Sequence, residues 1–374
     1  MSEGLELGDR IRGCLIGGAV GDALGAPIEF WSTEQIHAEA GPLGIRDFLP
    51  TGFGGARGLI TDDTQMTLFT VDGLIRMLTG QLMMGAEPAL DVLHQAYLRW
   101  LQTQDQHEPN VEDCDGWLAS QAWLYSRRAP GNTCLMALRA PGAIGQSARN
   151  DSKGCGGVMR SAPFGFLAQD RDAIYALTCR AAALTHGHPT GQHASGALAL
   201  IIHALRAGST VDGAVDTTLA FLGEQPDAEE TRTSLEAALA LARDSSSVEL
   251  GTIERLGQGW IAEEALAMSA YAALVFPDPN GFRDAMALAV SHGGDSDSTG
   301  AICGNILGAA HGLAVVPRDL AEGIEGRDPI LTVAEDFVFA LSVSGTTGAG
   351  TPALPADWDD RYPSDGHRLD EGLE

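Results

Sequence analysis

Basic residues are scarce in this chain of 374 residues: Lys153 is its single lysine, and 23 basic residues face 50 acidic ones. The formal charge of −27 excludes a general nucleic-acid-binding protein, because contact with a phosphate backbone requires a basic surface. No apolar run is long enough to span a bilayer, and the opening MSEGLELGDRIRG lacks the basic and apolar regions of a signal peptide. We therefore expect a cytoplasmic protein that binds neither nucleic acid nor membrane.

Paired cysteine motifs are also missing. The six cysteines are scattered along the chain without a C-x-x-C pair: Cys14, Cys114, Cys134, Cys155, Cys179 and Cys303. This spacing argues against a disulfide framework and against a zinc knuckle, and it is typical of a reducing compartment such as the cytoplasm.

The sequence has no regular alternation of apolar and polar residues, which is the pattern of β-strands. Apolar residues instead recur three and four positions apart, as in LFTVDGLIRML, ASGALALIIHALRA and AICGNILGAAHGLAV. Glycine and proline clusters such as GPLG and FPDPNG separate these segments. The pattern predicts an all-α fold, a single compact many-helix bundle over residues 1–345. The Gly-, Thr-, Pro- and Asp-rich segment 346–374 is expected to wrap over the surface or to be disordered.

Two of the predicted helices carry glycines at every fourth position. The first row is Gly13, Gly17, Gly21 and Gly25, and the second is Gly300, Gly304, Gly308 and Gly312. Each helical glycine costs about 1 kcal/mol relative to alanine, so a benefit should offset this cost. The sequence predicts close packing of these helices against each other or against a neighbour. A membrane dimer is excluded because polar residues interrupt both segments.

Hydroxyl and carboxylate side chains gather at two points, each just before an apolar helix: TDDT at 61–64 and DSDS at 295–298. Either cluster alone is explained by helix capping and by the helix dipole. Two such clusters beside buried helices require cations, and few basic residues stand nearby. The oxygen ligands favour Mg²⁺, Mn²⁺ or Ca²⁺ over zinc. An EF-hand is excluded, because Ile306 occupies the twelfth position, where a glutamate is required.

Two further segments have less specific patterns. The backbone N–H groups of SKGCGGVMRSAP could hold a phosphate, which Lys153 or Arg160 could neutralise, but the G-K-[ST] of a P-loop is missing. In THGHPTGQH, His186 and His188 either belong to an ordinary turn before a helix that starts at Pro189, or contact a ligand. The residues alone leave both interpretations open.

Six segments together resemble the ADP-ribosylglycohydrolases, the family of the dinitrogenase reductase-activating glycohydrolase and of ADP-ribosylarginine hydrolase. They are GCLIGGAVGDALGAPIEF, TDDTQMT, KGCGGVMRSAPFG, THGHPTG, GWIAEEALAMSAYA and HGGDSDSTGAICGNILGA. They follow one another in the family's order from about residue 10 to about residue 315. The resemblance implies an all-α fold of the ADP-ribosylglycohydrolase type, with two divalent cations, Mg²⁺ or Mn²⁺, at the bottom of a cleft.

The resemblance also assigns roles to individual residues. The implied metal ligands are Thr61, Asp62, Asp63, Asp295, Asp297 and Ser298, and the implied catalytic residues are Glu29, Asp62, Asp63 and Asp297. For the substrate, it places Gly154, Cys155, Gly156 and Gly157 at the diphosphate, His186 beside the adenosine, and Trp260 on the ribose and leaving-group side.

The implied activity is hydrolysis of the N-glycosidic bond between ADP-ribose and a protein arginine, carried out by a monomer on ADP-ribosylated proteins. Ser298, in the form DSDS, favours arginine as the linked residue. Three alternatives remain: cleavage of O-linked ADP-ribose from serine or from O-acetyl-ADP-ribose, binding of ADP-ribose without catalysis, and hydrolysis of another nucleotide-like glycoside.

Overall fold

The computed structural model describes residues 6–52, 54–84, 90–110, 114–244, 249–344 and 353–363. Within these ranges the chain forms fifteen α-helices joined by loops and short 3₁₀ turns, and no β-strand. The all-α prediction is therefore confirmed. The helices are α1 (Leu7–Gly25), α2 (Thr33–Ala40), α3 (Asp62–Met84), α4 (Leu90–Asp105), α5 (Asn132–Arg139), α6 (Arg171–Ala183), α7 (Pro189–Arg206), α8 (Val211–Leu222), α9 (Glu229–Arg243), α10 (Ala262–Val275), α11 (Phe282–Val290), α12 (Ser296–His311), α13 (Arg318–Gly323), α14 (Arg327–Val343) and α15 (Trp358–Arg361).

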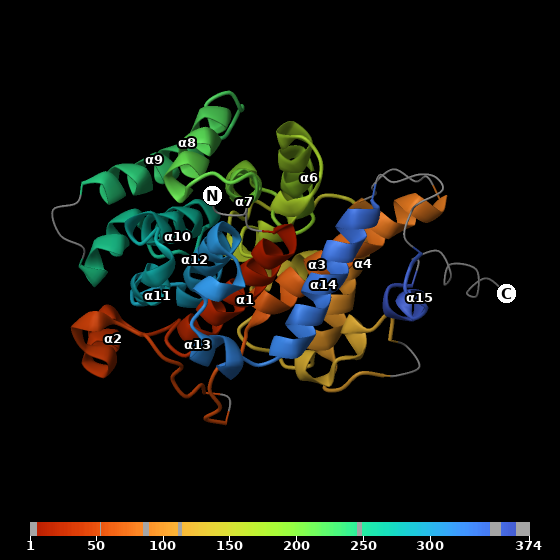
Figure 1. Ribbon diagram of the computed structural model, residues 1–374, viewed down its shortest axis with the longest axis horizontal. Helices are drawn as coiled ribbons and strands as arrows, with labels where there is room; N and C mark the ends of the chain where they lie inside the picture. Colours follow the sequence, from red (N-terminus) through yellow and green to blue (C-terminus); the bar gives the residue numbers. More distant parts are fainter. Residues whose placement is uncertain are drawn as a thin grey trace.

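Helices α1 and α12 pack against each other at the centre of the molecule (Figure 1). The two glycine rows face each other in antiparallel order, so that Gly13 lies opposite Gly308 and Gly17 opposite Gly304. A Cβ atom added to Gly17 would lie only 2.5 Å from the carbonyl oxygen of Gly304. The prediction of close helix packing is confirmed, because the two backbones touch without side chains between them.

The other helices surround this central pair. Helices α7, α10 and α11 pack against α12, while α3 and α14 pack against α1. Alanine makes up much of α10, and its buried small side chains let α10 lie close to α12. Helices α8 and α9 lie at the periphery beside α10, and α2 projects at the lower left of the view, below α11 (Figure 1). None of the described helices is long and apolar enough to cross a membrane.

Three helix ends meet because of this arrangement. Since α12 is antiparallel to α1, its N-terminal end lies beside the C-terminal end of α1, where the Gly25 backbone contacts Ser296. The N-terminal end of α3 is held at the same place by hydrogen bonds to Asp22 of α1. The two clusters of oxygen-bearing side chains, at 61–64 and 295–298, thus lie on neighbouring helix ends.

The C-terminal part of the described chain folds back onto α14. Trp358 is buried, with its ring 5.0 Å from that of Phe339 and 4.9 Å from that of Tyr362. Arg361 and the Tyr362 hydroxyl both bind Asp336 of α14. The rest of the segment 346–374 lies outside the described residues, so the boundary at residue 345 stays a prediction.

Candidate metal centre and active site

Asp22 connects α1 to the beginning of α3. Its buried carboxylate accepts hydrogen bonds from the backbone N–H groups of Thr61 (3.0 Å) and Thr64 (3.1 Å) and from the Thr64 hydroxyl (2.5 Å). Asp22 therefore caps the N-terminal end of α3 and fixes the turn that carries residues 61–63. The sequence analysis assigned no site role to this residue, because nothing in the spacing links it to a turn about forty positions away.

Residues 61–63 form the first half of the site. The Asp63 N–H donates to the Thr61 hydroxyl oxygen (3.3 Å), and the Gly131 N–H donates to Oδ2 of Asp62 (3.3 Å). One carboxylate oxygen of Asp63, Oδ1, is buried and has no hydrogen-bond partner among the described residues. A buried carboxylate oxygen without a partner is costly, so it points to a ligand that the chain itself does not supply.

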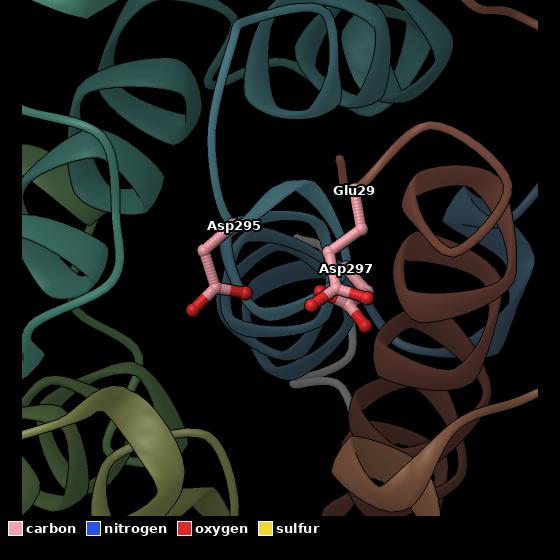
Figure 2. Close-up of side chains that lie close together, drawn as sticks. All are labelled: Glu29, Asp295 and Asp297. Carbon is pink, nitrogen blue, oxygen red and sulfur yellow. The ribbon is translucent and has the colours of Figure 1, made fainter. Parts of the chain in front are cut away.

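The second half lies at the start of α12. Asp295 is fixed by its backbone N–H, which donates to the carbonyl oxygen of Gln258 (2.8 Å), and the Ser298 N–H donates to Oδ1 of Asp297 (3.0 Å). Carboxylate oxygens of Glu29, Asp295 and Asp297 all lie within 4.8 Å of one another. Figure 2 shows these three carboxylates at the N-terminal end of α12, with Glu29 and Asp297 side by side.

Electrostatic repulsion is strong in this group of carboxylates. Burial and the proximity of Asp297 raise the pKa of Asp22 to about 7 and that of Glu29 to about 10. The pKa values of Asp62 and Asp63 also lie well above the ordinary range, first because of burial and then because of Asp297. Six buried carboxylates share the site: Asp22, Glu29, Asp62, Asp63, Asp295 and Asp297.

The donor set fits a divalent cation. In the part of the chain that the structure describes, none of the six carboxylates forms an ion pair with a basic side chain. Buried like charges are stable only when protonated or neutralised, and the unpartnered Oδ1 of Asp63 is available to a cation. Carboxylate and hydroxyl oxygens are the ligands of Mg²⁺ and Mn²⁺ rather than of zinc.

The glycine-rich loop at 154–157 lies near this site and is tied to the beginning of α10. The Cys155 N–H donates to the carbonyl oxygen of Trp260 (3.2 Å), and the Ala262 N–H donates to that of Lys153 (2.8 Å). Burial and the neighbouring Asp295 and Asp63 raise the pKa of the Cys155 thiol, which keeps the thiol protonated. The thiol also hydrogen-bonds to Asp295 and Ser298, so the loop contacts the carboxylate group through the Cys155 side chain.

The basic side chains around this loop are already bound within the protein. Lys153 pairs with Glu230 and Glu263. Arg160 is buried and donates to the carbonyl oxygen of Gly156 (2.6 Å) and to the hydroxyl of Thr185 (2.7 Å). Its guanidinium group also stacks on the ring of Tyr97. Neither residue therefore points a free positive charge at a ligand, and any phosphate held by the loop would be bound by its backbone.

His186 supports the loop from beneath. Its ring is 1 % exposed, and Nδ1 lies 2.9 Å from the Thr185 hydroxyl. Burial and the nearby Arg160 lower its pKa to about 3, so the ring is neutral. A Cβ atom added to Gly156 would lie 3.2 Å from the ring, which shows how closely the loop covers it. The expected contact between His186 and adenosine stays a prediction.

Trp260 stands between the loop and a cavity of about 660 Å³. Its side chain is 39 % exposed and stacks on Phe30, with ring centroids 5.8 Å apart and an interplanar angle of 18°. Glu29 lines the cavity and also belongs to the carboxylate group, so the cavity opens directly beside the candidate metal centre.

Comparison with known proteins decides the family. Residues 3–347 match the family model for ADP-ribosylglycohydrolase. The chain belongs to the ADP-ribosylglycohydrolase family. The family membership supports an enzyme that hydrolyses ADP-ribosyl bonds, in agreement with the resemblance of the six segments.

Relatives of the chain share a modest part of its sequence over most of its length. It is 26 % identical to the ADP-ribosyl-[dinitrogen reductase] glycohydrolase of Rhodospirillum rubrum, covering 84 % of this chain and 90 % of the relative. It is 25 % identical to the ADP-ribosylhydrolase ARH3 of Bos taurus, covering 88 % and 92 %. It is 23 % identical to the ADP-ribosylarginine hydrolase Tri1 of Serratia proteamaculans, covering 88 % and 79 %.

A solved structure described as an ADP-ribosylglycohydrolase-related protein complex has the same fold. It superposes with a TM-score of 0.64 at 24 % identity, covering 89 % of this chain and 98 % of the other. The predicted fold type is thus confirmed.

In this ADP-ribosylglycohydrolase, oxygens of Glu29, Asp295 and Asp297 lie within 4.8 Å of one another. The other candidate ligands, Thr61, Asp62, Asp63 and Ser298, lie close enough to Asp295 or Asp297 to affect their pKa values or to have their own raised. The candidate substrate residues are distributed around them. The glycine loop lies on one side, His186 lies beneath that loop, and Trp260 borders the cavity. The roles of these residues in binding and catalysis stay predictions.

Proposed function

We propose that this ADP-ribosylglycohydrolase is a metal-dependent ADP-ribosylarginine hydrolase. It would cleave the N-glycosidic bond between ADP-ribose and a protein arginine, acting as a monomer in the cytoplasm. The observation that carries the proposal is the buried group of six carboxylates, which has no basic partner among the described residues and borders an acidic cavity. In a member of this family, such carboxylates could hold cations that assist the attack of water on a ribose carbon.

Two divalent cations, Mg²⁺ or Mn²⁺, would be held by residues from both helix ends. The proposed ligands are Thr61, Asp62, Asp63, Asp295, Asp297 and Ser298. When bound, the cations would bind ribose hydroxyl groups and lower the pKa of water. The buried position of the carboxylates excludes bulk solvent, which strengthens every electrostatic interaction with the substrate.

The side chains of the protein would move the protons of the reaction. Water adds to C1 of the ribose as the C–N bond breaks, and one of its protons passes to the departing guanidine nitrogen. Asp62, Asp63 or Asp297 would accept the proton from the water. Glu29 would deliver a proton to the guanidine, because it is the one member of the six-carboxylate group that also lines the cavity proposed for the leaving group. The loop at 154–157 would bind the diphosphate through its backbone.

A second candidate is the hydrolysis of O-linked ADP-ribose. The similarity to ARH3 and the similarity to Tri1 are nearly equal, so sequence identity does not distinguish between substrates. The leaving group does distinguish them, because arginine is a planar cation whereas a serine hydroxyl is neutral. The negative charge at the edge of the site favours arginine.

The decisive experiment measures the release of ADP-ribose from arginine-linked peptide, serine-linked peptide and O-acetyl-ADP-ribose, each with Mg²⁺, with Mn²⁺ and with a chelator. We expect the arginine-linked substrate to be hydrolysed fastest, and only with metal. Faster release from either O-linked substrate would establish the second candidate. Full activity after removal of all divalent cations would contradict the proposed metal centre, and binding without hydrolysis would identify a non-catalytic ADP-ribose binder.

A further inference from the structure

The cavity beside the carboxylate group has its own walls, distinct from those of the glycine loop. Three segments line it: residues 29–34 after α1, residues 254–260 before α10, and residues 293–294 before α12. No residue of the loop at 154–157 takes part. Trp260 contacts both the loop and the cavity, because its carbonyl oxygen accepts from the Cys155 N–H and it also lines the cavity, and Glu29 is shared with the carboxylate group. The cavity therefore adjoins the carboxylate group without including the loop.

The charge of the cavity is negative. Glu29, Glu34 and Glu254 line it, and no lysine, arginine or histidine does so among the described residues. Glu29 is 8 % exposed and forms no hydrogen bond among the described residues, and because its pKa is raised to about 10, Glu34 and Glu254 supply the negative charge of the cavity. A diphosphate would be repelled here, whereas a cation would be attracted.

Aromatic side chains form the entrance of the cavity. Phe30 is 74 % exposed and Trp260 39 % exposed, and both belong to the few large apolar side chains that the described chain leaves in solvent. Their rings stack on each other, and both residues line the cavity together with the carboxylates and with Trp31, which adds a third ring. An aromatic face together with a carboxylate is the environment that binds a planar guanidinium group, through cation–π contact and charge-assisted hydrogen bonds.

Glu254 holds the walls of the cavity together. One of its oxygens, Oε1, accepts hydrogen bonds from the Thr33 hydroxyl and from the Gly293 N–H (3.2 Å). The described structure gives the other oxygen, Oε2, no hydrogen-bond partner. Glu254 can therefore fix the three segments with one oxygen and meet a ligand with the other.

We propose that this cavity is a guanidinium subsite, which takes the side chain of the ADP-ribosylated arginine and thereby selects arginine over neutral acceptors. The inference rests on the proposed function and names the residues that give it its specificity: Glu254 and Trp260 bind the cation, while Phe30 and Trp31 enclose it. The ADP-ribose portion would lie at the glycine loop, and the scissile bond would lie between the two subsites, beside Glu29.

The test uses two variants, Glu254→Gln and Trp260→Ala, in the full-length protein with Mn²⁺. The glutamine keeps the oxygen that accepts from Thr33 and Gly293 while removing the charge. The matched control is Glu39→Gln, at an exposed position of α2 outside the cavity lining. The probes are n-butylguanidine and its neutral analogue n-butylurea, which are nearly identical in shape.

We expect n-butylguanidine to compete with arginine-linked substrate, and n-butylurea to bind at least about tenfold more weakly. Each cavity variant should raise KM for the arginine-linked substrate, and Kd for n-butylguanidine, by about fivefold relative to the control. The Kd for ADP-ribose should stay unchanged in Glu254→Gln, and the far-UV circular dichroism spectrum of Trp260→Ala should match that of the wild type, which shows that both variants remain folded.

Equal affinity for the two probes, or KM values in both variants equal to that of the control, would overturn the subsite. The outcome is separable from the proposed function. If the wild-type protein does not hydrolyse arginine-linked substrate but binds n-butylguanidine through Glu254 and Trp260, the proposed function is wrong and the cation site stands. If it hydrolyses that substrate and the variants match the control, only the subsite is wrong.

Discussion

Replacing Gly17 by alanine tests whether the glycine rows hold the two halves of the site together. A Cβ atom at Gly17 would lie 2.5 Å from the Gly304 carbonyl oxygen, whereas ordinary contacts begin at 3.4 Å, so α1 and α12 would have to move apart by about 0.9 Å. The obstacle is backbone, which cannot rotate away as a side chain can. Overpacking of this kind costs about 3 kcal/mol. Alanine recovers about 1 kcal/mol of helix propensity, which leaves a net loss of about 2 kcal/mol.

The assay is urea unfolding of the metal-free protein, followed by titration with Mn²⁺. Because α12 carries Asp295 and Asp297 at its N-terminal end, its displacement should also weaken Mn²⁺ binding by about tenfold, as loss of a supporting contact does at metal sites. The matched control is Gly80→Ala in α3, where no atom of another described segment lies within 4 Å of the new Cβ, and it should raise the free energy of unfolding by about 0.5 kcal/mol. If Gly17→Ala proves as stable as this control, the close approach of the helices does not require glycine.

Three other predictions concern charge. Asp63→Asn removes a buried carboxylate with an unpartnered oxygen, so it should lower kcat about a hundredfold or more and weaken Mn²⁺ binding, which calorimetry measures. The same variant should raise the free energy of unfolding of the metal-free protein, which urea unfolding measures. Chelation of divalent cations should destabilise the wild type by about 2.7 kcal/mol relative to cation at 100 times Kd. This loss should be larger at pH 8 than at pH 6, because the raised pKa of Asp22, about 7, leaves this site carboxylate mostly protonated at pH 6 and mostly ionised at pH 8. A pH-independent difference would contradict this. Burial lowers the pKa of His292 from 6.5 to about 4, so the unfolded chain takes up the proton first and the free energy of unfolding falls as pH decreases between these values. The variant His292→Gln should remove about 2 kcal/mol of the loss between pH 7 and pH 5. Urea unfolding at both pH values measures this difference.

The sequence predicted the helical class and the glycine packing because both leave a local signature. Apolar residues three and four positions apart mark each buried helix face, and glycine at every fourth position marks a face with no side chains. The capping box of Ser32 and Gln35, which starts α2, is also present in the sequence, but the segment behind it has too few apolar residues to indicate a helix.

Contacts between distant segments left no such signature. Asp22 and the turn at Thr61 are joined only by the fold, and the spacing of either residue gives no indication of the other. Arg160 illustrates the same difficulty: an arginine beside a glycine loop suggests a phosphate ligand, yet the structure buries it under the loop, where it binds a carbonyl oxygen. The cavity beside the carboxylate group likewise combines three segments that are separated along the chain, so its charge and its aromatic entrance appear only in the folded structure.

The antiparallel pairing of α1 with α12 also orders events during synthesis. The first helix of the described chain is completed by a helix that begins only at Ser296, so the glycine face of α1 has no partner until most of the protein has been made. The carboxylates of the two helix ends cannot converge before that moment. A nascent or truncated chain without α12 would retain the TDDT turn but would lack the carboxylates of 295–297. Cation capture would therefore mark the completion of folding rather than its beginning.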